Sequence, residues 1–103
     1  MSEARLEQFE KQPAENFPFA VEFSGCLPAG LTIASGVVAA VVHRTGLADN
    51  SVLDSLTATI VGTQAIARVK AGVNGVTYKI TYTITLSDGS VLEEDVLMQV
   101  IDR

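Results

Sequence analysis

The side chains that could do catalytic or metal chemistry are few, and they are scattered along the chain. There is one histidine, His43, and one cysteine, Cys26. A thiol nucleophile needs a nearby base, and a zinc site needs three or four ligands, and nothing in the sequence brings such groups together. We interpret His43 as a strand-end or surface imidazole and Cys26 as a small, buried hydrophobic residue in a turn.

The acidic residues also lack the spacing of a cation site. The acids at 93–95 are consecutive, so along a strand they point alternately to opposite faces. Asp49, Asn50 and Asp54 could form a weak calcium-type cluster, but such residues are ordinary in turns. The glycine-rich segment 71–75 has neither the lysine nor the following helix of a phosphate loop. We therefore predict no catalytic residue, no metal ligand and no cofactor.

Composition excludes several classes of partner. The chain has 103 residues, a net charge of −5 and a pI near 4.6, so nucleic-acid binding through phosphate contacts is not expected. The longest apolar run, 37–42, is too short to cross a bilayer. One cysteine cannot form an internal disulfide, and the charged start of the chain is unlike a signal peptide. We expect a chain made in the cytoplasm.

The most regular pattern lies at 73–86, where an Asn-Gly corner precedes a strand with two different faces. Threonines and a lysine alternate with a second set that we assign to the core, namely Tyr78, Ile80, Tyr82 and Ile84. A two-residue period predicts a half-buried strand. Tyr78 follows the corner as in the tyrosine corner of immunoglobulin-like sandwiches, where the hydroxyl binds the preceding backbone.

The rest of the sequence predicts further short strands separated by turns. An Asp-Gly pair at 87–90 predicts a hairpin. Strands are expected at 17–23, 31–44 (as one strand or as two pieces broken at Ser35-Gly36), 52–61, 65–70, 76–86 and 91–101. The prediction is an all-β, immunoglobulin-like antiparallel sandwich of about seven strands over 17–103, preceded by an N-terminal arm over 1–16.

The six residues at 37–42 are apolar on both faces of the predicted strand, although an antiparallel sandwich strand normally has one wet face. A cover by the arm, or small residues on a tolerant surface, would explain this pattern. A subunit contact would explain it too, and we take Val38, Ala40 and Val42 as the candidate interface. On this hypothesis Val38→Lys or Val42→Lys separates an oligomer and leaves the fold intact.

Several short motifs, in their order, resemble one family. They are Lys-x-Pro-x-Glu at 11–15, a Ser-x-x-Leu turn within 23–28, Thr-Ile-Ala-Ser at 32–35, and a Gly-rich corner followed by Tyr at 72–78. Together they resemble the small Ig-like structural proteins of tailed phages and prophages known as phage fiber-tail adaptor proteins. The similarity extends over about 11–101. Cys26 and the Val-Asn pair of the corner depart from the family pattern.

This resemblance implies a non-enzymatic virion component that acts in tail assembly through protein–protein contacts. It implies other phage structural proteins as partners, with a homo-oligomer as a further option, no nucleic acid and no membrane. Assembly in the host cytoplasm follows from the same reading. The alternative is a bacterial Ig-like adhesion or carbohydrate-binding module, which would need exposed aromatic rings beside polar groups.

Overall fold

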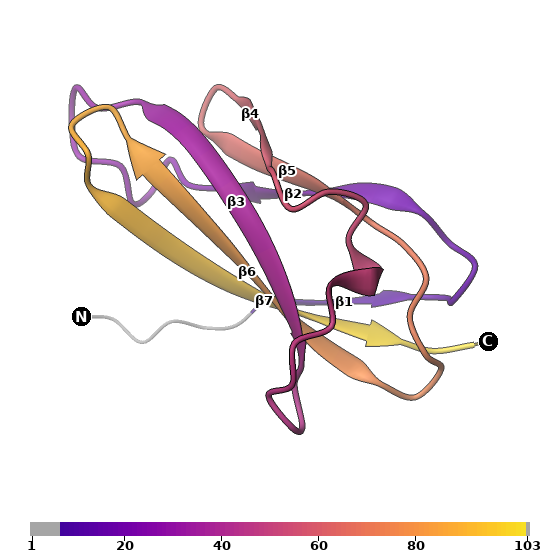
Figure 1. Cartoon of the computed structure of the whole chain (residues 1–103). Coiled ribbons are helices and arrows are strands. Elements are labelled where there is room, and N and C mark those ends of the chain that lie inside the picture. Colours follow the sequence, from indigo (N-terminus) through magenta and orange to yellow (C-terminus); the bar gives the residue numbers. More distant parts are fainter. Residues whose placement is uncertain (1–6, 103) are drawn as a thin grey trace.

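Seven strands form two stacked sheets in the computed structural model, which describes residues 7–102 (Figure 1). The elements in chain order are β1 (Glu7–Lys11), β2 (Phe17–Glu22), β3 (Ile33–Val42), the 3-10 turn η1 (Asn50–Val52), β4 (Thr59–Val61), β5 (Gln64–Val69), β6 (Thr77–Leu86) and β7 (Val91–Val100). Within the described part, no helix is long and apolar enough to cross a membrane.

The strand order is that of an immunoglobulin-like sandwich. One sheet has the order β1-β7-β6-β3 and the other the order β2-β5-β4. β3, β6 and β7 therefore correspond to the C, F and G strands of such domains, and β2, β5 and β4 to B, E and D. The predicted fold class is confirmed, with one difference: β1 runs parallel to β7, while the other strand pairs are antiparallel.

Part of the segment predicted as an N-terminal arm belongs to the sandwich. Residues 7–11 form β1 and pair with β7 from Val96 to Val100, and residues 1–6 lie outside the described part of the chain. The Phe9 ring stacks on Phe19 at 4.0 Å and meets Phe17 edge-on at 6.1 Å. These rings bury apolar surface between β1 and β2, and this burial stabilises the position of β1 in the sandwich.

The inner face of β6 forms the centre of the core. Tyr78, Ile80, Tyr82 and Ile84 are each at most 1% exposed, and they face the second sheet. The Tyr82 hydroxyl crosses between the sheets and donates to the Phe19 carbonyl at 2.9 Å. Burial raises the pKa of Tyr82, and the charge of Glu7 raises it further.

β3 is one continuous strand with an irregularity between Ile33 and Ser35, so the Ser-Gly step does not divide it. Val38 pairs with Tyr82 and Ala40 with Ile80, and these two β3 side chains are 3% and 1% exposed. They belong to the core and cannot form a subunit contact. The predicted outcome of Val38→Lys is therefore corrected: a buried charge would destabilise the fold itself. Val42 is half-buried.

The segment from 47 to 58 closes one side of the sandwich, and of the strand predicted at 52–61 only Thr59–Val61 forms β4. The Val38 and Val42 amides donate to Leu56 and Leu47, and the Lys70 amide donates to Val52, so the segment touches both sheets. Its first part turns at η1, where the Asp49 carboxylate accepts the Ser51 amide. A hairpin between β4 and β5 then follows around residues 62–63.

Candidate interaction surfaces

The residues singled out for possible chemistry lie apart. Cys26 lies in the turn before β3 but is exposed, so the prediction that it is buried is wrong; His43 is exposed just after β3 ends. A ten-residue strand spans about 33 Å, so the thiol and the imidazole lie at opposite ends of the sandwich. Across residues 7–102, no three His, Cys, Asp or Glu side chains are grouped as metal ligands. Asp49 instead caps η1.

The outer side of β3 and β6 carries no charged side chain over residues 35–39 and 81–85, and we call this part the uncharged face. In the register of the two strands, Val37 lies opposite Thr83 and Ala39 opposite Thr81, while Val41 lies opposite Lys79, which bounds the face at this end. Val37 is 55% exposed and Ala39 is also exposed. Within residues 37–41 of β3, the side chains that reach the surface are thus the odd-numbered ones, because Val38 and Ala40 pair with the buried face of β6.

An acidic strip on β7 borders the uncharged face. Glu93 lies opposite Thr83 and Asp95 opposite Thr81, and the Thr81 hydroxyl donates to the Asp95 carboxylate at 2.7 Å. The face is therefore apolar along β3, hydroxylated along β6 and anionic along β7. A sheet face with such a gradient suits a protein contact better than a small ligand, which needs a concave site.

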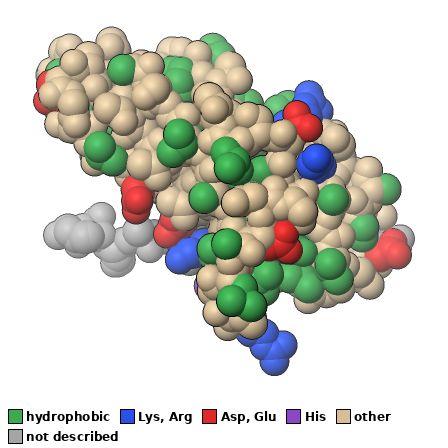
Figure 2. Space-filling model, in the orientation of Figure 1, with side chains coloured by type: hydrophobic (Ala, Val, Ile, Leu, Met, Phe, Trp, Pro, Cys, Tyr) green, Lys and Arg blue, Asp and Glu red, His purple; other side chains and the backbone are tan. Residues whose placement is uncertain are grey.

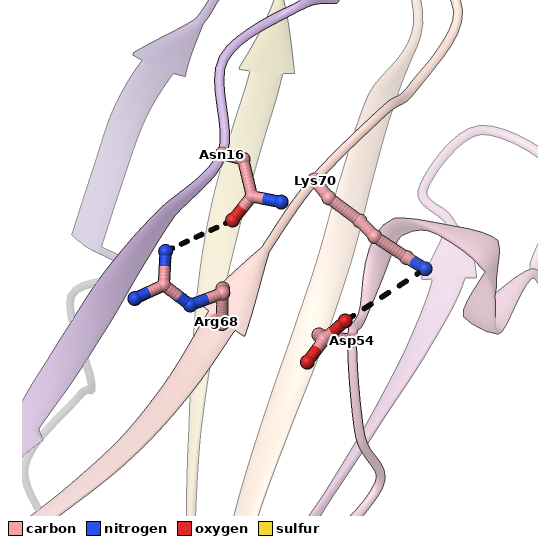
Figure 3. A network of polar contacts seen from close by, with 4 residues as sticks. All are labelled: Asn16, Asp54, Arg68 and Lys70. Carbon is pink, nitrogen blue, oxygen red and sulfur yellow. Dashed lines mark hydrogen bonds and ion pairs between the residues drawn. The ribbon is translucent and has the colours of Figure 1, made fainter.

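The opposite sheet has a charged and polar outer side. Arg68 donates to the Asn16 side chain at 3.0 Å, and Lys70 lies 4.0 Å from the Asp54 carboxylate (Figure 3). These contacts tie β5 to the segments on either side of it. Since the groups are solvent-exposed, each contact stabilises the fold by less than about 1 kcal/mol.

One end of the sandwich, made of residues 43–47 and 71–76, contains the predicted tyrosine corner; we call it the corner end. The Tyr78 hydroxyl accepts the Val73 amide at 3.0 Å. The chain before it adopts two left-handed conformations, with φ of 52° at Ala71 and 102° at Gly72. The Gly75 amide donates to Val100, which joins the corner to the end of β7.

Lys11 also holds this corner, and sequence reasoning did not identify it. Its side chain is completely buried, and its ammonium donates to the carbonyls of Gln12 at 2.7 Å, Pro13 at 3.2 Å and Ala71. Burial lowers the pKa of Lys11, while the negative charge of Glu15 opposes that shift. The Lys-x-Pro-x-Glu motif is thus a structural unit, in which the Glu15 carboxylate also accepts the Gln12 amide.

A pocket of about 240 Å³ opens at the corner end. It is lined by Val42, His43, Arg44, Gly75, Val76 and Thr77. The His43 amide donates to Thr77, which fixes the two sides of the pocket to each other. Leu47 and Val73, in the two loops of this end, are 67% and 61% exposed. Figure 2 shows the projecting loop after β3 with green and blue side chains at its tip.

The other end, made of residues 24–32, 62–63 and 87–90, is the hairpin end. Asp88 accepts the Ser90 amide at 2.9 Å, and this bond lowers the pKa of its carboxyl group. A hydrogen bond from the Thr63 hydroxyl similarly lowers the pKa of Glu22. Both groups are anionic at neutral pH, and the three segments contain no Lys, Arg or His.

Comparison with known proteins agrees with this geometry. No curated protein and no solved structure matches the chain. The family described as podophage GP4 fiber-tail adaptor protein gp77 matches residues 11–99, from the buried Lys11 to the end of β7. The match includes both sheets and the corner, and the chain therefore belongs to the podophage GP4 fiber-tail adaptor protein gp77 family.

Proposed function

We propose that this chain is a non-enzymatic virion component that acts in phage tail assembly by docking other structural proteins on its uncharged face. The observation that carries the proposal is the pair of exposed apolar side chains of Val37 and Ala39, which lie opposite Thr83 and Thr81 of β6. Such a face can pack closely against a partner, because its side chains are short and have little rotamer entropy to lose.

The acidic strip on β7 supplies the polar border of this contact. Specific interfaces commonly combine an apolar centre with a charged rim, and the rim controls orientation and partner choice. Here Glu93 and Asp95 lie on one side of the uncharged face, so the preferred partner presents a flat apolar patch with basic residues along one margin.

A sugar-binding or adhesion module has less support. All six aromatic side chains are described, and Phe23, Tyr78 and Tyr82 are buried while Phe9, Phe17 and Phe19 are half-buried. The three half-buried rings pack against the core and close the side between β1 and β2. They are engaged in the fold, so they do not form a platform for a sugar ring.

The proposal is tested by placing one charge on each outer side of the sandwich. Ala39→Arg adds a long cation to the uncharged face, and Ala20→Arg adds the same group to an exposed position of β2 on the other sheet. Phage particles produced with each variant are purified, and the copies of this chain per particle are measured by quantitative mass spectrometry. We expect at least about a tenfold loss with Ala39→Arg, equal to about 1.4 kcal/mol, and near-normal incorporation with Ala20→Arg.

Circular dichroism of the two purified variants establishes that both fold. Normal incorporation and normal tails with folded Ala39→Arg would contradict a docking role for this face. Equal losses from both variants would contradict it as well, because the effect would then be independent of the sheet that carries the charge.

A further inference from the structure

The described basic residues all lie toward the corner end. β6 runs from this end to the hairpin end, and β3 and β7 run the opposite way, so residue numbers give the position along the sandwich. The five basic residues within 7–102 are Lys11, Arg44, Arg68, Lys70 and Lys79. By contrast, the segments 24–32, 59–67 and 81–92 contain no Lys, Arg or His. The hairpin end can therefore offer negative charge alone, whereas the corner end combines these cations with carboxylates such as those of Glu15 and Asp102.

At the corner end, the pocket carries a cation without a carboxylate partner. Among residues 7–102 the ion pair is that of Lys70 with Asp54, and Arg44 has none. Arg44 and His43 line the pocket beside the apolar side chains of Val42 and Val76. A planar guanidinium in this position is suited to a carboxylate, which it can bind through two parallel hydrogen bonds.

At the hairpin end, the exposed tip carries the opposite charge. Asp88 uses one carboxylate oxygen to accept the Ser90 amide, so the other oxygen can accept further donors. Val91 is the first residue after the 87–90 hairpin, and its side chain is 58% exposed. Each end thus combines a charge with exposed apolar side chains, which at the corner end are Leu47 and Val73.

We propose that the corner-end pocket receives the 87–90 hairpin of a second copy of this chain, with Asp88 of one copy against Arg44 of the next. The pocket volume of about 240 Å³ is many times the roughly 10–15 Å³ of cavity that holds one water, so a carboxylate side chain has room to enter. Gly89 beside Asp88 has open space around it, so the backbone of the tip can approach closely.

The geometry makes this a head-to-tail contact. The two complementary sites lie at opposite ends of ten-residue strands, about 33 Å apart, so one copy cannot bring its own ends together. A contact between two different surfaces repeats from copy to copy and forms a ring if the rotation closes. The inference goes beyond the proposed function, because it concerns the ends of the sandwich and not the uncharged face.

The test is a charge exchange followed by sedimentation velocity of the full chain over a range of concentrations at low salt. Arg44→Glu and Asp88→Lys should each raise the dissociation constant of self-association at least about tenfold. An equimolar mixture of the two variants should associate again, and so should the double variant, because each restores opposite charges across the contact. Arg68→Glu is the matched control, with the same charge change outside the pocket, and should associate like the unmodified chain.

Three results would overturn the inference. One is an unmodified chain that stays monomeric up to its solubility limit. Another is a loss with Arg68→Glu as large as that with Arg44→Glu, which would indicate a general charge effect. The last is the absence of restored association in both the mixture and the double variant. Thermal unfolding verifies that every variant is folded, and Ala39→Arg should self-associate normally, which separates this inference from the proposed function.

Discussion

At the corner end, residues distant in sequence hold the backbone, whereas at the hairpin end the turn holds itself. The Ala71 carbonyl accepts from Lys11, sixty residues away, and Val73 donates to Tyr78. At the hairpin end, the Ser90 amide donates to Asp88 and the Gly89 amide donates to the Leu86 carbonyl at 2.9 Å. The comparison teaches that one end depends on the assembled sandwich and the other on local turn chemistry.

The largest difference between the two ends should appear when their glycines are changed to alanine. Gly72 has φ of 102°, and a Cβ there would lie 2.7 Å from the Val100 side chain, so strain and overlap add. We expect Gly72→Ala to lower the free energy of unfolding by about 3 kcal/mol. Gly89 has φ of 91° with nothing within 4 Å, and Gly89→Ala should cost only about 1 kcal/mol.

Urea denaturation followed by circular dichroism measures both variants. Equal losses would contradict the distinction, because they would mean that the close approach of Val100 to the corner adds nothing to the cost of the backbone conformation.

A smaller effect is expected from the buried ammonium. Lys11→Met keeps the length of the side chain but leaves three carbonyls without their donor, and we expect a loss of about 2 kcal/mol in the free energy of unfolding. Lys79→Met is the control on the outer side of β6 and should change this free energy by less than about 0.5 kcal/mol. The same urea titrations compare them, and a Lys11→Met protein as stable as Lys79→Met would refute the role of Lys11.

The smallest effect is expected from the corner hydroxyl alone. Tyr78→Phe keeps the buried ring and removes the acceptor of the Val73 amide, which should cost about 1 kcal/mol. Hydrogen exchange observed by NMR should become faster at Val73 and stay unchanged at Ser90, whose partner is in the hairpin. Unchanged exchange at Val73 would show that another group fixes the corner.

The sequence predicted best those features whose signal lies within a few residues. The alternation at 77–86 predicted β6 and its buried face, and the Asp-Gly pair predicted the hairpin. The Asn-Gly corner followed by Tyr78 predicted a hydroxyl–backbone bond, and the hydrogen bond to Val73 confirms it. In each case the cause is local, namely side-chain alternation or turn conformation, so a short window of sequence contains it.

Predictions that depended on a partner strand were less accurate. The run at 37–42 is apolar at every position, so it contains no polar residue to indicate which side faces water. Its register with β6 determines which side chains are buried, because it places Val38 and Ala40 against the core and Val37 and Ala39 outside. The same holds for 7–11, whose place at the edge of the sheet depends on contacts with β7 and β2.

By itself the sequence determined the all-β class, the acidic charge, the strand with the tyrosine corner and the motifs of a phage adaptor family. The tertiary structure alone decided which side of β3 is exposed, that Lys11 is buried beneath the corner, and that the described basic side chains lie toward one end of the sandwich. The physical reason is that period and turn residues act over a few positions, whereas register and burial arise from groups that meet only when the two sheets pack.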